Sequence, residues 1–389
     1  MLYITLLDQF HPGIYSSQVI DVCDYLNKKH SEKIRLVAFL SIRELRRSDA
    51  RKKIKQLSPN SLVLPAFPGL KNFEWTALLL FFVCFFTGER VAICRNVFCT
   101  KMALRVKKIG ILNKVVLDGR SALSAEIEEY DVFPVDYLRR NIKRIENYSV
   151  NNSDFRIAVS SQLVNYWKEY FKYKEENEVI IPCTLDNKFF SESNFLIDKK
   201  TEVIKETLGI RPNDVVLVYS GSAAPWQSFE LMEKTLSPLL ENDERIKILF
   251  LSKENKENKY FKQKYPNRVF IKWLEHKDVL SYLHCCDYGL LLREQSDTNK
   301  VASPVKFAEY LYAGLPVLIT ENLGDFSNYV IENDCGFIIK ESHTDWSLLK
   351  KMDVRTKEKC FLLAKRDFMK ESEKNTYSYQ KLLMALKMY

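Results

Sequence analysis

Short apolar runs alternate with amphipathic segments along almost the whole chain. In the first half, the apolar runs predict strands at residues 2–7, 34–39, 61–66, 91–94, 115–118, 156–160 and 179–182. In the second half, they predict strands at residues 215–220, 246–251, 268–271, 288–292, 316–319 and 336–340. Strands that alternate with helices of about 10–15 residues form βαβ units and parallel sheets. Since such units connect right-handedly, each half is expected to form its own doubly wound sheet.

The length of the chain also indicates two domains. A chain of 389 residues exceeds the size at which a single core normally stops growing. The join is expected near residues 182–200, where a strand gives way to a polar stretch. In open parallel sheets, ligands bind beyond the carboxyl ends of the strands. Two such sheets facing each other would therefore place one site in an interdomain cleft.

Composition is ordinary for a globular protein outside the membrane, with 46% apolar and 28% charged residues. The nine cysteines are odd in number, scattered, and without paired metal-ligand spacing. They are expected to be reduced thiols of a cytoplasmic protein, and not a disulfide framework or a zinc site. No signal peptide is apparent at the start of the chain.

The formal net charge of +9 is concentrated in the first half. Basic residues crowd three predicted helices: Arg43, Arg46, Arg47, Arg51, Lys52, Lys53 and Lys55 in one, Lys101, Arg105, Lys107 and Lys108 in another, and Arg139, Arg140, Lys143 and Arg144 in the third. Such runs are either solvated faces or a surface for an anionic membrane or substrate. Nucleic acid is disfavoured as a partner, because aromatic residues do not interleave with the basic ones.

The most apolar stretch of the chain, residues 77–86, is too short to span a bilayer, which takes about 20 apolar residues. Two interpretations stay open for it. It is either a buried helix of the first domain or a segment that enters the bilayer surface.

Residues 303–320 carry the most informative pattern for chemistry. Ser303 is expected to cap a helix, Pro304 to take its first position and Gly314 to end it. Free backbone amides at the start of that helix favour an anion such as a diphosphate. Lys306 precedes Glu309 by three residues on the same face, so a surface ion pair worth about 0–1 kcal/mol is an alternative.

This segment resembles the nucleotide-binding helix of retaining glycosyltransferases of the GT-B fold, in the large group called family four. There, a first Glu is followed after seven residues by a second, and then by an apolar residue, a small residue, Gly, a variable residue and Pro-Val. Glu309 matches the second Glu, and Ala313 to Val317 match the tail. The resemblance implies that Glu309 hydrogen-bonds the ribose of a sugar nucleotide.

Two positions depart from the family pattern. Val301 stands where the first Glu is expected, as in a capsule and O-antigen sub-branch with Ser-Pro-x-Lys-x-x-Glu, here Ser303-Pro304-Val305-Lys306 before Glu309. Arg293 and Asn299 are the nearby polar candidates to replace that Glu. Trp226-Gln227 stands where the family often has a phosphate-binding Lys followed by Gly.

The resemblance extends over nearly the whole chain, through residues 159–161, 179–189, 216–222, 279–292 and 366–383. It implies an α/β fold of two Rossmann-like doubly wound domains facing across a cleft. Residues 1–185 would bind the acceptor and residues 186–369 the nucleotide sugar, while a terminal helix at 370–389 crosses back to the first domain. Gly221 and Ser222, in the turn that opens the second domain, are implied donor-binding residues together with Ser303, Pro304, Val305 and Glu309.

The first domain offers fewer readable residues. Gly13, Tyr15 and Gln18 follow the first predicted strand and resemble the acceptor-side loop of the family. Arg95 follows another strand, and Asp118 and Arg120 follow a third. A carboxylate could deprotonate or orient an acceptor hydroxyl, and an Arg could hold a phosphate. A loop salt bridge between Asp118 and Arg120 is the alternative.

The sequence therefore predicts a metal-independent glycosyltransferase with no cofactor, which uses a nucleotide diphosphate sugar as co-substrate. Its acceptor would be a hydroxyl of a surface glycan or a lipid-linked molecule, with retention of configuration. Arg293 and Lys306 are expected to stabilise the leaving diphosphate. The alternatives are a nucleotide-sugar epimerase of the same fold and a non-catalytic nucleotide-sugar-binding protein.

Overall fold

The computed structural model describes residues 1–7, 10, 12–47, 49–131, 136–185, 199–222, 224–340 and 346–387. Contacts divide the chain into two compact units. Unit 1 comprises Met1–Asp186 and Glu373–Tyr389, and unit 2 comprises Asn187–Ser372. Most of the predicted join, residues 186–198, lies outside the described residues. The acceptor and donor roles of the two units remain predictions.

Unit 1 is built on a parallel sheet of seven strands in the order β3-β2-β1-β4-β5-β6-β7. The strands are β1 (Leu2–Leu7), β2 (Arg35–Leu40), β3 (Leu62–Pro65), β4 (Val91–Arg95), β5 (Lys114–Gly119), β6 (Phe155–Ala158) and β7 (Glu178–Ile180). Nearly every residue of the central strands is buried, as expected for a parallel sheet that is covered on both faces.

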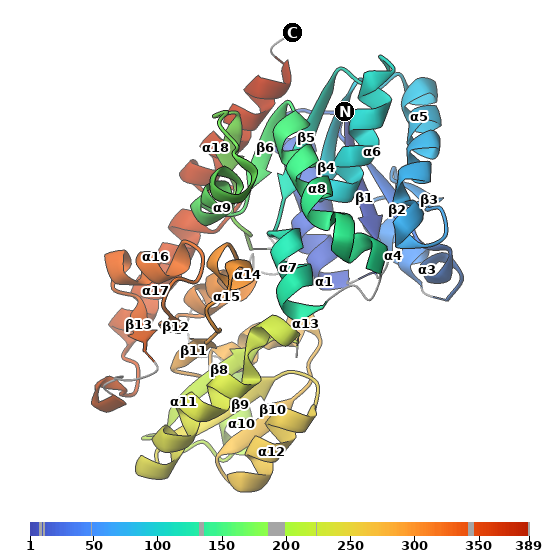
Figure 1. Ribbon diagram of the computed structural model, residues 1–389. Coiled ribbons are helices and arrows are strands. Elements are labelled where there is room, and N and C mark those ends of the chain that lie inside the picture. The colour runs from blue at the N-terminus through green and yellow to red at the C-terminus, as the bar shows by residue number, and fades with distance from the viewer. Residues whose placement is uncertain are drawn as a thin grey trace. The chain divides into compact units, whose positions relative to one another are not determined.

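The helices of unit 1 cover both faces of this sheet. They are α1 (Pro12–Tyr15), a π-helical turn (Ser16–Ile20), α2 (Asp21–Lys29), α3 (Ile42–Arg47), α4 (Ala50–Leu57), a 3-10 helix (Leu70–Trp75), α5 (Thr76–Thr87), α6 (Val97–Lys108), α7 (Leu123–Tyr130), α8 (Asp136–Asn152), α9 (Ser161–Phe171) and α18 (Glu373–Lys387). Apolar residues of α2, α4 and α18 share one core with the strands, whereas α5, α6 and α8 pack side by side (Figure 1). The terminal helix α18 therefore belongs to unit 1, as predicted.

Unit 2 has a parallel sheet of six strands in the order β10-β9-β8-β11-β12-β13. The strands are β8 (Val215–Ser220), β9 (Ile246–Leu251), β10 (Val269–Lys272), β11 (Tyr288–Leu291), β12 (Val317–Thr320) and β13 (Gly336–Ile339). The helices are α10 (Lys199–Thr207), a 3-10 helix (Pro225–Gln227), α11 (Phe229–Asn242), α12 (Lys256–Lys264), α13 (His276–Leu283), α14 (Asp297–Lys300), α15 (Val305–Tyr312), α16 (Phe326–Asn333), a 3-10 helix (Trp346–Leu348) and α17 (Val354–Asp367).

Both sheets have the Rossmann strand order, in which the chain reverses its direction of travel beside the first strand. The reversal lies between β1 and β4 in unit 1 and between β8 and β11 in unit 2. Ligands of such sheets bind outside the carboxyl ends of the strands at this switch point. The topology thus marks one candidate location in each unit.

Every strand predicted from the apolar runs is present, with ends that shift by at most two residues. The α/β fold of two doubly wound units is confirmed, and all nine cysteines are free thiols. One local expectation is wrong, because Gly13 to Gln18 are helical instead of a loop. The helix at residues 77–86 is buried on one side only, so it is not the fully buried helix of the first interpretation.

Candidate functional site

The residues predicted to bind the donor gather at the switch point of unit 2. Gly221 and Ser222 follow the last residue of β8, and Arg293 lies two residues after β11. These strands are neighbours in the sheet, so their carboxyl ends meet at one edge. Helix α15, which carries Lys306 and Glu309, begins at the same edge because it connects β11 to β12.

Helix α15 is held against the sheet by Tyr310, and a glycine makes room for that ring. A Cβ atom on Gly289 of β11 would lie 2.3 Å from the Tyr310 ring. The Tyr310 hydroxyl accepts a hydrogen bond from the backbone N–H of Ser220 at 2.8 Å and donates to the carbonyl of Leu290 at 3.3 Å. One side chain therefore joins α15 to β8 and to β11.

The start of α15 differs by one residue from the expectation. The helix begins at Val305, and Pro304 is its N-cap, in an extended conformation without a side-chain cap hydrogen bond. Ser303 precedes the cap, so its predicted role as N-cap is wrong. It is nonetheless buried, with 8% of its surface exposed.

Lys306 is the central cation of this site. Its side chain is buried, and the Nζ atom donates a hydrogen bond to Oε1 of Gln227 at 2.9 Å. The same Nζ lies 4.3 Å from the centroid of the Tyr219 ring. A Cβ atom on Gly221, whose φ is +149°, would lie 2.9 Å from Nζ. The ammonium group thus lies against bare backbone at the end of β8.

Electrostatics set this ammonium group apart from a surface lysine. Burial and then the nearby Arg293 guanidinium lower the pKa of Lys306 well below its usual value, while Glu309 raises it less. Within the described part of the chain, Lys306 forms no ion pair with Glu309. The surface ion pair considered from the sequence is therefore wrong, because the turn of the helix directs Lys306 into the protein.

Arg293 is fixed by the loop that follows β11. Its backbone N–H donates to Oγ1 of Thr320 at 3.1 Å, and its Nη1 donates to Oδ1 of Asn299 at 3.3 Å. Asn299 in turn donates to the carbonyl of Glu294 at 3.0 Å. Both Arg293 and Asn299 are buried, as is Val301 at 0% exposed. The structure brings the two predicted polar candidates together.

Glu309 lies one turn after Lys306 and keeps 13% of its side chain exposed. Its Oε1 lies 3.8 Å from Nε2 of His276, the first residue of α13. The sequence pattern did not single out His276, and it identified Gln227 only as part of the Trp226-Gln227 departure from the family's lysine. Nothing in the local pattern of either residue indicated a contact with α15, since both lie far from that helix along the chain.

In unit 1, the Asp118 carboxylate lies near the carboxyl ends of β4 and β5 and has three partners. Its carboxylate is 0% exposed and lies 2.7 Å from Nε of Arg120 and 3.7 Å from Nη1 of Arg95. The Tyr3 hydroxyl also donates to it. The predicted salt bridge between Asp118 and Arg120 is present, but it belongs to a larger buried cluster.

The charges of this cluster stabilise one another. Burial lowers the pKa of the Arg120 guanidinium, but Asp118 and weaker contributions raise it more, so the net pKa lies above the ordinary value. Burial and then Asp118 raise the pKa of Tyr3 well above its usual value. Asp118 holds two cations in place here, and its action as a base towards an acceptor remains a prediction.

Of the other acceptor-side candidates, Gln18 contacts this cluster, Tyr15 is buried against β1, and Gly13 is exposed. The carbonyl of Gln18 accepts a hydrogen bond from Nη1 of Arg95 at 3.1 Å, and its side chain donates to the carbonyl of Thr184 at 3.1 Å. Tyr15 is buried and shares a hydrogen bond of 3.0 Å with Thr5 of β1. Gly13 is exposed and has no neighbour within 4 Å of a Cβ position, so nothing in its surroundings requires a glycine.

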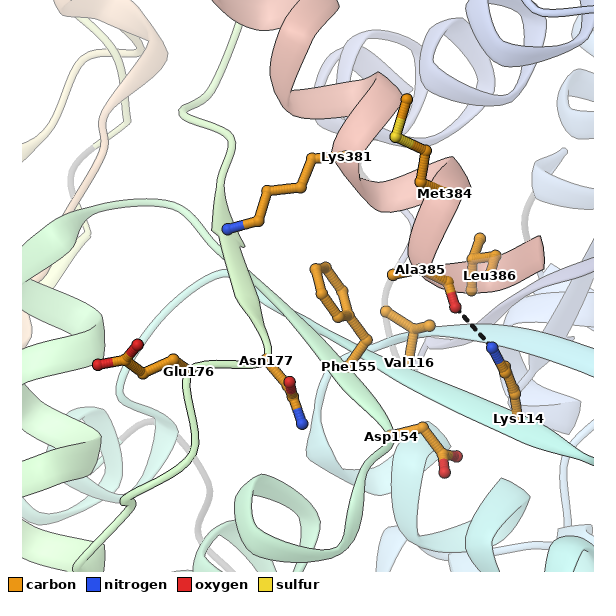
Figure 2. A pocket seen from close by; sticks show the side chains of 10 residues that line it. All are labelled: Lys114, Val116, Asp154, Phe155, Glu176, Asn177, Lys381, Met384, Ala385 and Leu386. Atoms are coloured by element: carbon orange, nitrogen blue, oxygen red, sulfur yellow. Dashed lines mark hydrogen bonds between the residues drawn. The ribbon is translucent and has the colours of Figure 1, made fainter. Parts of the chain in front are cut away.

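A cavity of about 500 Å³ lies in unit 1 at the opposite ends of the strands. Its walls include Lys114 and Phe155, the first residues of β5 and β6, and Met384 of α18 (Figure 2). Lys114 donates to the carbonyl of Ala385 at 2.6 Å and so ties down the end of α18. Residues of α18 form part of the wall of this cavity, and none of the predicted site residues lines it. Among the described residues, no group of three or more His, Cys, Asp or Glu could hold a metal ion.

Comparison with known proteins bears on the fold and on the C-terminal part of the chain. Residues 234–383 match the model of the glucosyltransferase 3-like C-terminal domain family. No curated protein matches the chain by sequence. Among solved structures, a glycosyltransferase from Rickettsia africae is 15% identical with a TM-score of 0.72, over 100% of this chain and 99% of that one. HepE of Anabaena in complex with UDP is 13% identical with a TM-score of 0.66, over the full length of both chains.

A second class of enzyme shares the fold less closely. A UDP-N-acetylglucosamine 2-epimerase from Listeria monocytogenes, itself assigned only provisionally, is 12% identical with a TM-score of 0.54. The match covers 100% of this chain and 96% of that one. The chain thus has the GT-B fold of these glycosyltransferases, and the C-terminal part resembles a glucosyltransferase domain in sequence as well.

Proposed function

We propose that the protein transfers a sugar from a nucleotide diphosphate sugar to a hydroxyl of a glycan or a lipid-linked acceptor, in the cytoplasm or at the inner face of the cell membrane. One observation carries the proposal. A buried lysine, Lys306, lies against bare backbone at the switch point of unit 2, with Arg293 nearby and with Glu309 one turn further along the helix. A buried lysine and a buried arginine at that place suit a diphosphate, and the carboxylate suits ribose hydroxyls.

In this proposal, each residue of unit 2 has one task. Lys306 and Arg293 neutralise the charge that develops on the leaving diphosphate, together with the backbone amides at the start of α15. Glu309 accepts hydrogen bonds from the ribose. Gly221 lets the phosphates approach the backbone, because a side chain there would meet Lys306.

Gln227 positions Lys306 in this arrangement. The family resemblance places a phosphate-binding lysine at about this position, whereas this chain has an amide that accepts a hydrogen bond from Lys306. The positive charge therefore reaches the same place from α15 instead of from the loop after β8. The departure from the family pattern at Trp226-Gln227 and the presence of Lys306 in α15 compensate each other.

Unit 1 would bind the acceptor beside Arg95 and Arg120. Both guanidinium groups are held by Asp118 but keep 14–16% of their side chains exposed. A phosphate or hydroxyl group of an acceptor could reach these exposed edges. Metal-independent transfer with retention of configuration is part of the proposal.

The test is binding and turnover with a panel of nucleotide diphosphate sugars. A thermal shift identifies the donor, since a ligand at 100 times its dissociation constant stabilises the protein by about 2.7 kcal/mol. Lys306→Met should reduce the shift strongly. Lys259→Met, an exposed lysine of α12, is the matched control and should retain it.

The rival functions differ in their products. An epimerase converts the sugar nucleotide with no acceptor present, and a binding protein shows the shift without transfer or donor hydrolysis. An unchanged thermal shift in Lys306→Met would place the donor elsewhere and contradict the proposal.

A further inference from the structure

Helix α5 of unit 1 presents an exposed apolar face. None of its twelve residues is charged. One side of the helix packs against α6 (Figure 1), and its buried residues are Thr76, Ala77, Leu80 and Cys84. The other side, extended by the preceding tryptophan, leaves large side chains exposed: Trp75 65%, Leu78 52%, Phe82 45%, Phe85 60% and Phe86 78%.

The exposed phenylalanine rings form one continuous surface. The rings of Phe81 and Phe85 stack at 6.0 Å, and those of Phe82 and Phe86 stack at 6.3 Å. Phe85 and Phe86 meet edge to face at 5.6 Å. Single exposed apolar residues are common, but a contiguous aromatic face is typical of a binding surface.

Positive charge surrounds this face. Lys71 is exposed in the 3-10 helix that precedes α5, and Arg90 is exposed just after it. Lys101 and Arg105 of α6 both pair with Glu74, the residue before Trp75. One carboxylate therefore faces two cations at the start of the aromatic face, and the net local charge is positive.

Unit 1 as a whole also carries a net positive charge. Counted by sequence, unit 1 carries 31 Lys and Arg against 22 Asp and Glu, whereas unit 2 carries 28 of each. The entire formal net charge of +9 thus lies in the unit that carries the aromatic face. A second copy docking through this face would bring two positive units together, which electrostatic repulsion opposes. A negatively charged surface is complementary.

We propose that the outer face of α5 inserts into the interfacial region of an anionic lipid bilayer. A helix of twelve residues is about 18 Å long and cannot cross a hydrocarbon core of about 30 Å, so it lies along the surface. No helix in the described part of the chain is long and apolar enough to span a membrane. Phenylalanine and tryptophan suit this interface, and the flanking cations contact lipid phosphates. The binding itself does not depend on the proposed function, and only its use, to bring unit 1 to a lipid-linked acceptor, rests on it.

Vesicle sedimentation without any nucleotide tests the proposal. The vesicles contain phosphatidylcholine alone or with about 30 mol% phosphatidylglycerol, at low and high salt. The full-length protein should bind the anionic vesicles and be released by salt. The triple variant Phe82→Ser, Phe85→Ser, Phe86→Ser should lose at least about tenfold in partitioning.

Matched controls separate this face from general surface hydrophobicity and general charge. The triple variant Ile331→Ser, Leu348→Ser, Leu362→Ser removes exposed apolar side chains of unit 2 and should partition within about twofold of the wild type. Lys71→Glu should weaken binding to anionic vesicles about tenfold, whereas Lys259→Glu on α12 of unit 2 should not change it.

Three results would overturn the proposal. The first is equal recovery of the wild type from neutral and anionic vesicles. The second is equal loss of binding in both triple variants. The third is that the wild type binds no vesicle and self-associates, whereas the α5 triple variant is monomeric. That result would make the face an interface between copies of the protein.

Two further measurements keep the outcomes separable. If the triple variant does not fold, Phe86→Ser alone, at the most exposed ring, should still lower partitioning. Nucleotide affinity in the α5 variants should equal that of the wild type, so a failure of vesicle binding and a failure of the donor site are recognised independently.

Discussion

The burial of Lys306 predicts that binding of a nucleoside diphosphate is accompanied by uptake of a proton. In the free protein, burial and Arg293 lower the pKa of this lysine. A diphosphate oxygen about 4 Å from Nζ contributes about 4 kcal/mol at an effective dielectric constant of about 20. This energy corresponds to a rise of about 3 pKa units in the bound state, since one unit is 1.36 kcal/mol.

The number of protons taken up and the pH dependence of the affinity follow from the pKa of Lys306 in the free protein and its pKa in the complex. A separation of about 3 units gives an uptake of about 0.9 proton at the pH midway between them. The protonated lysine binds the diphosphate more tightly. Affinity is therefore full below the pKa of the free protein, falls as the pH rises towards the pKa of the complex, and levels off above it.

Calorimetric titration measures the uptake directly. A nucleoside diphosphate is titrated into the protein between about pH 7.5 and 9.5, where a terminal phosphate with a second pKa of about 6 is fully ionised. The slope of the observed enthalpy against the ionisation enthalpy of the buffer gives the number of protons. Lys306→Met should bind more weakly and give a slope near zero, whereas the exposed control Lys259→Met should behave as the wild type.

The reasoning fails on either of two results. A slope below about 0.2 throughout this pH range in the wild type would contradict proton uptake by Lys306 on binding. An equal slope in wild type and Lys306→Met would mean that another group takes up the proton.

Three further predictions concern the other site residues. Glu309→Ala should weaken nucleoside diphosphate binding by about 10- to 150-fold for each hydrogen bond lost, because a hydrogen bond to a charged group contributes about 1.5–3 kcal/mol. The melting temperature of the free protein should not change. Calorimetry measures the affinity, and an unchanged affinity would contradict the ribose contact. Arg293→Ala should lower kcat more than donor affinity, because charge builds up on the diphosphate as the bond breaks; steady-state kinetics decide it, and wild-type kcat would exclude Arg293 from the leaving-group site. Asp118→Asn should lower the free energy of unfolding by about 3–5 kcal/mol in urea titrations, because the variant leaves Arg120 and Arg95 buried without their carboxylate. A loss below about 1 kcal/mol would show that solvent takes the place of the carboxylate.

The strands of both units were predictable from the sequence because buried parallel strands are rich in apolar residues. Val215–Ser220 and Ile246–Leu251 have the predicted bounds, since each is bordered by polar or turn residues. The alternation with helices implied parallel sheets, and the resemblance of residues 303–320 pointed to the edge at which Lys306 and Glu309 lie. The sequence pattern located the ends of helices less well than the ends of strands. Ser303 and Pro304 both fit the start of a helix, and the backbone places the cap on Pro304.

The contacts within the candidate site depend on the order of the strands, which local patterns do not contain. Gln227 and Lys306 are 79 residues apart and meet only because β8 and β11 are neighbours in the sheet. The same adjacency of β4 and β5 brings Arg95 to Asp118. A sequence pattern shows that a lysine lies on a helix, but the packing of that helix decides whether the ammonium faces water or the backbone of Gly221.

Helix α5 shows most clearly which properties the sequence determines and which depend on packing. Its twelve uncharged residues determined a helix that is too short to span a membrane, and they left open whether it is buried or exposed. Exposure depends on what covers each side, and α6 covers only the side of Ala77, Leu80 and Cys84. The sequence by itself determined the elements, the parallel sheets and the sign of the charge on unit 1. The tertiary structure alone decided which side chains meet, because contacts between distant segments follow from the order in which strands and helices pack.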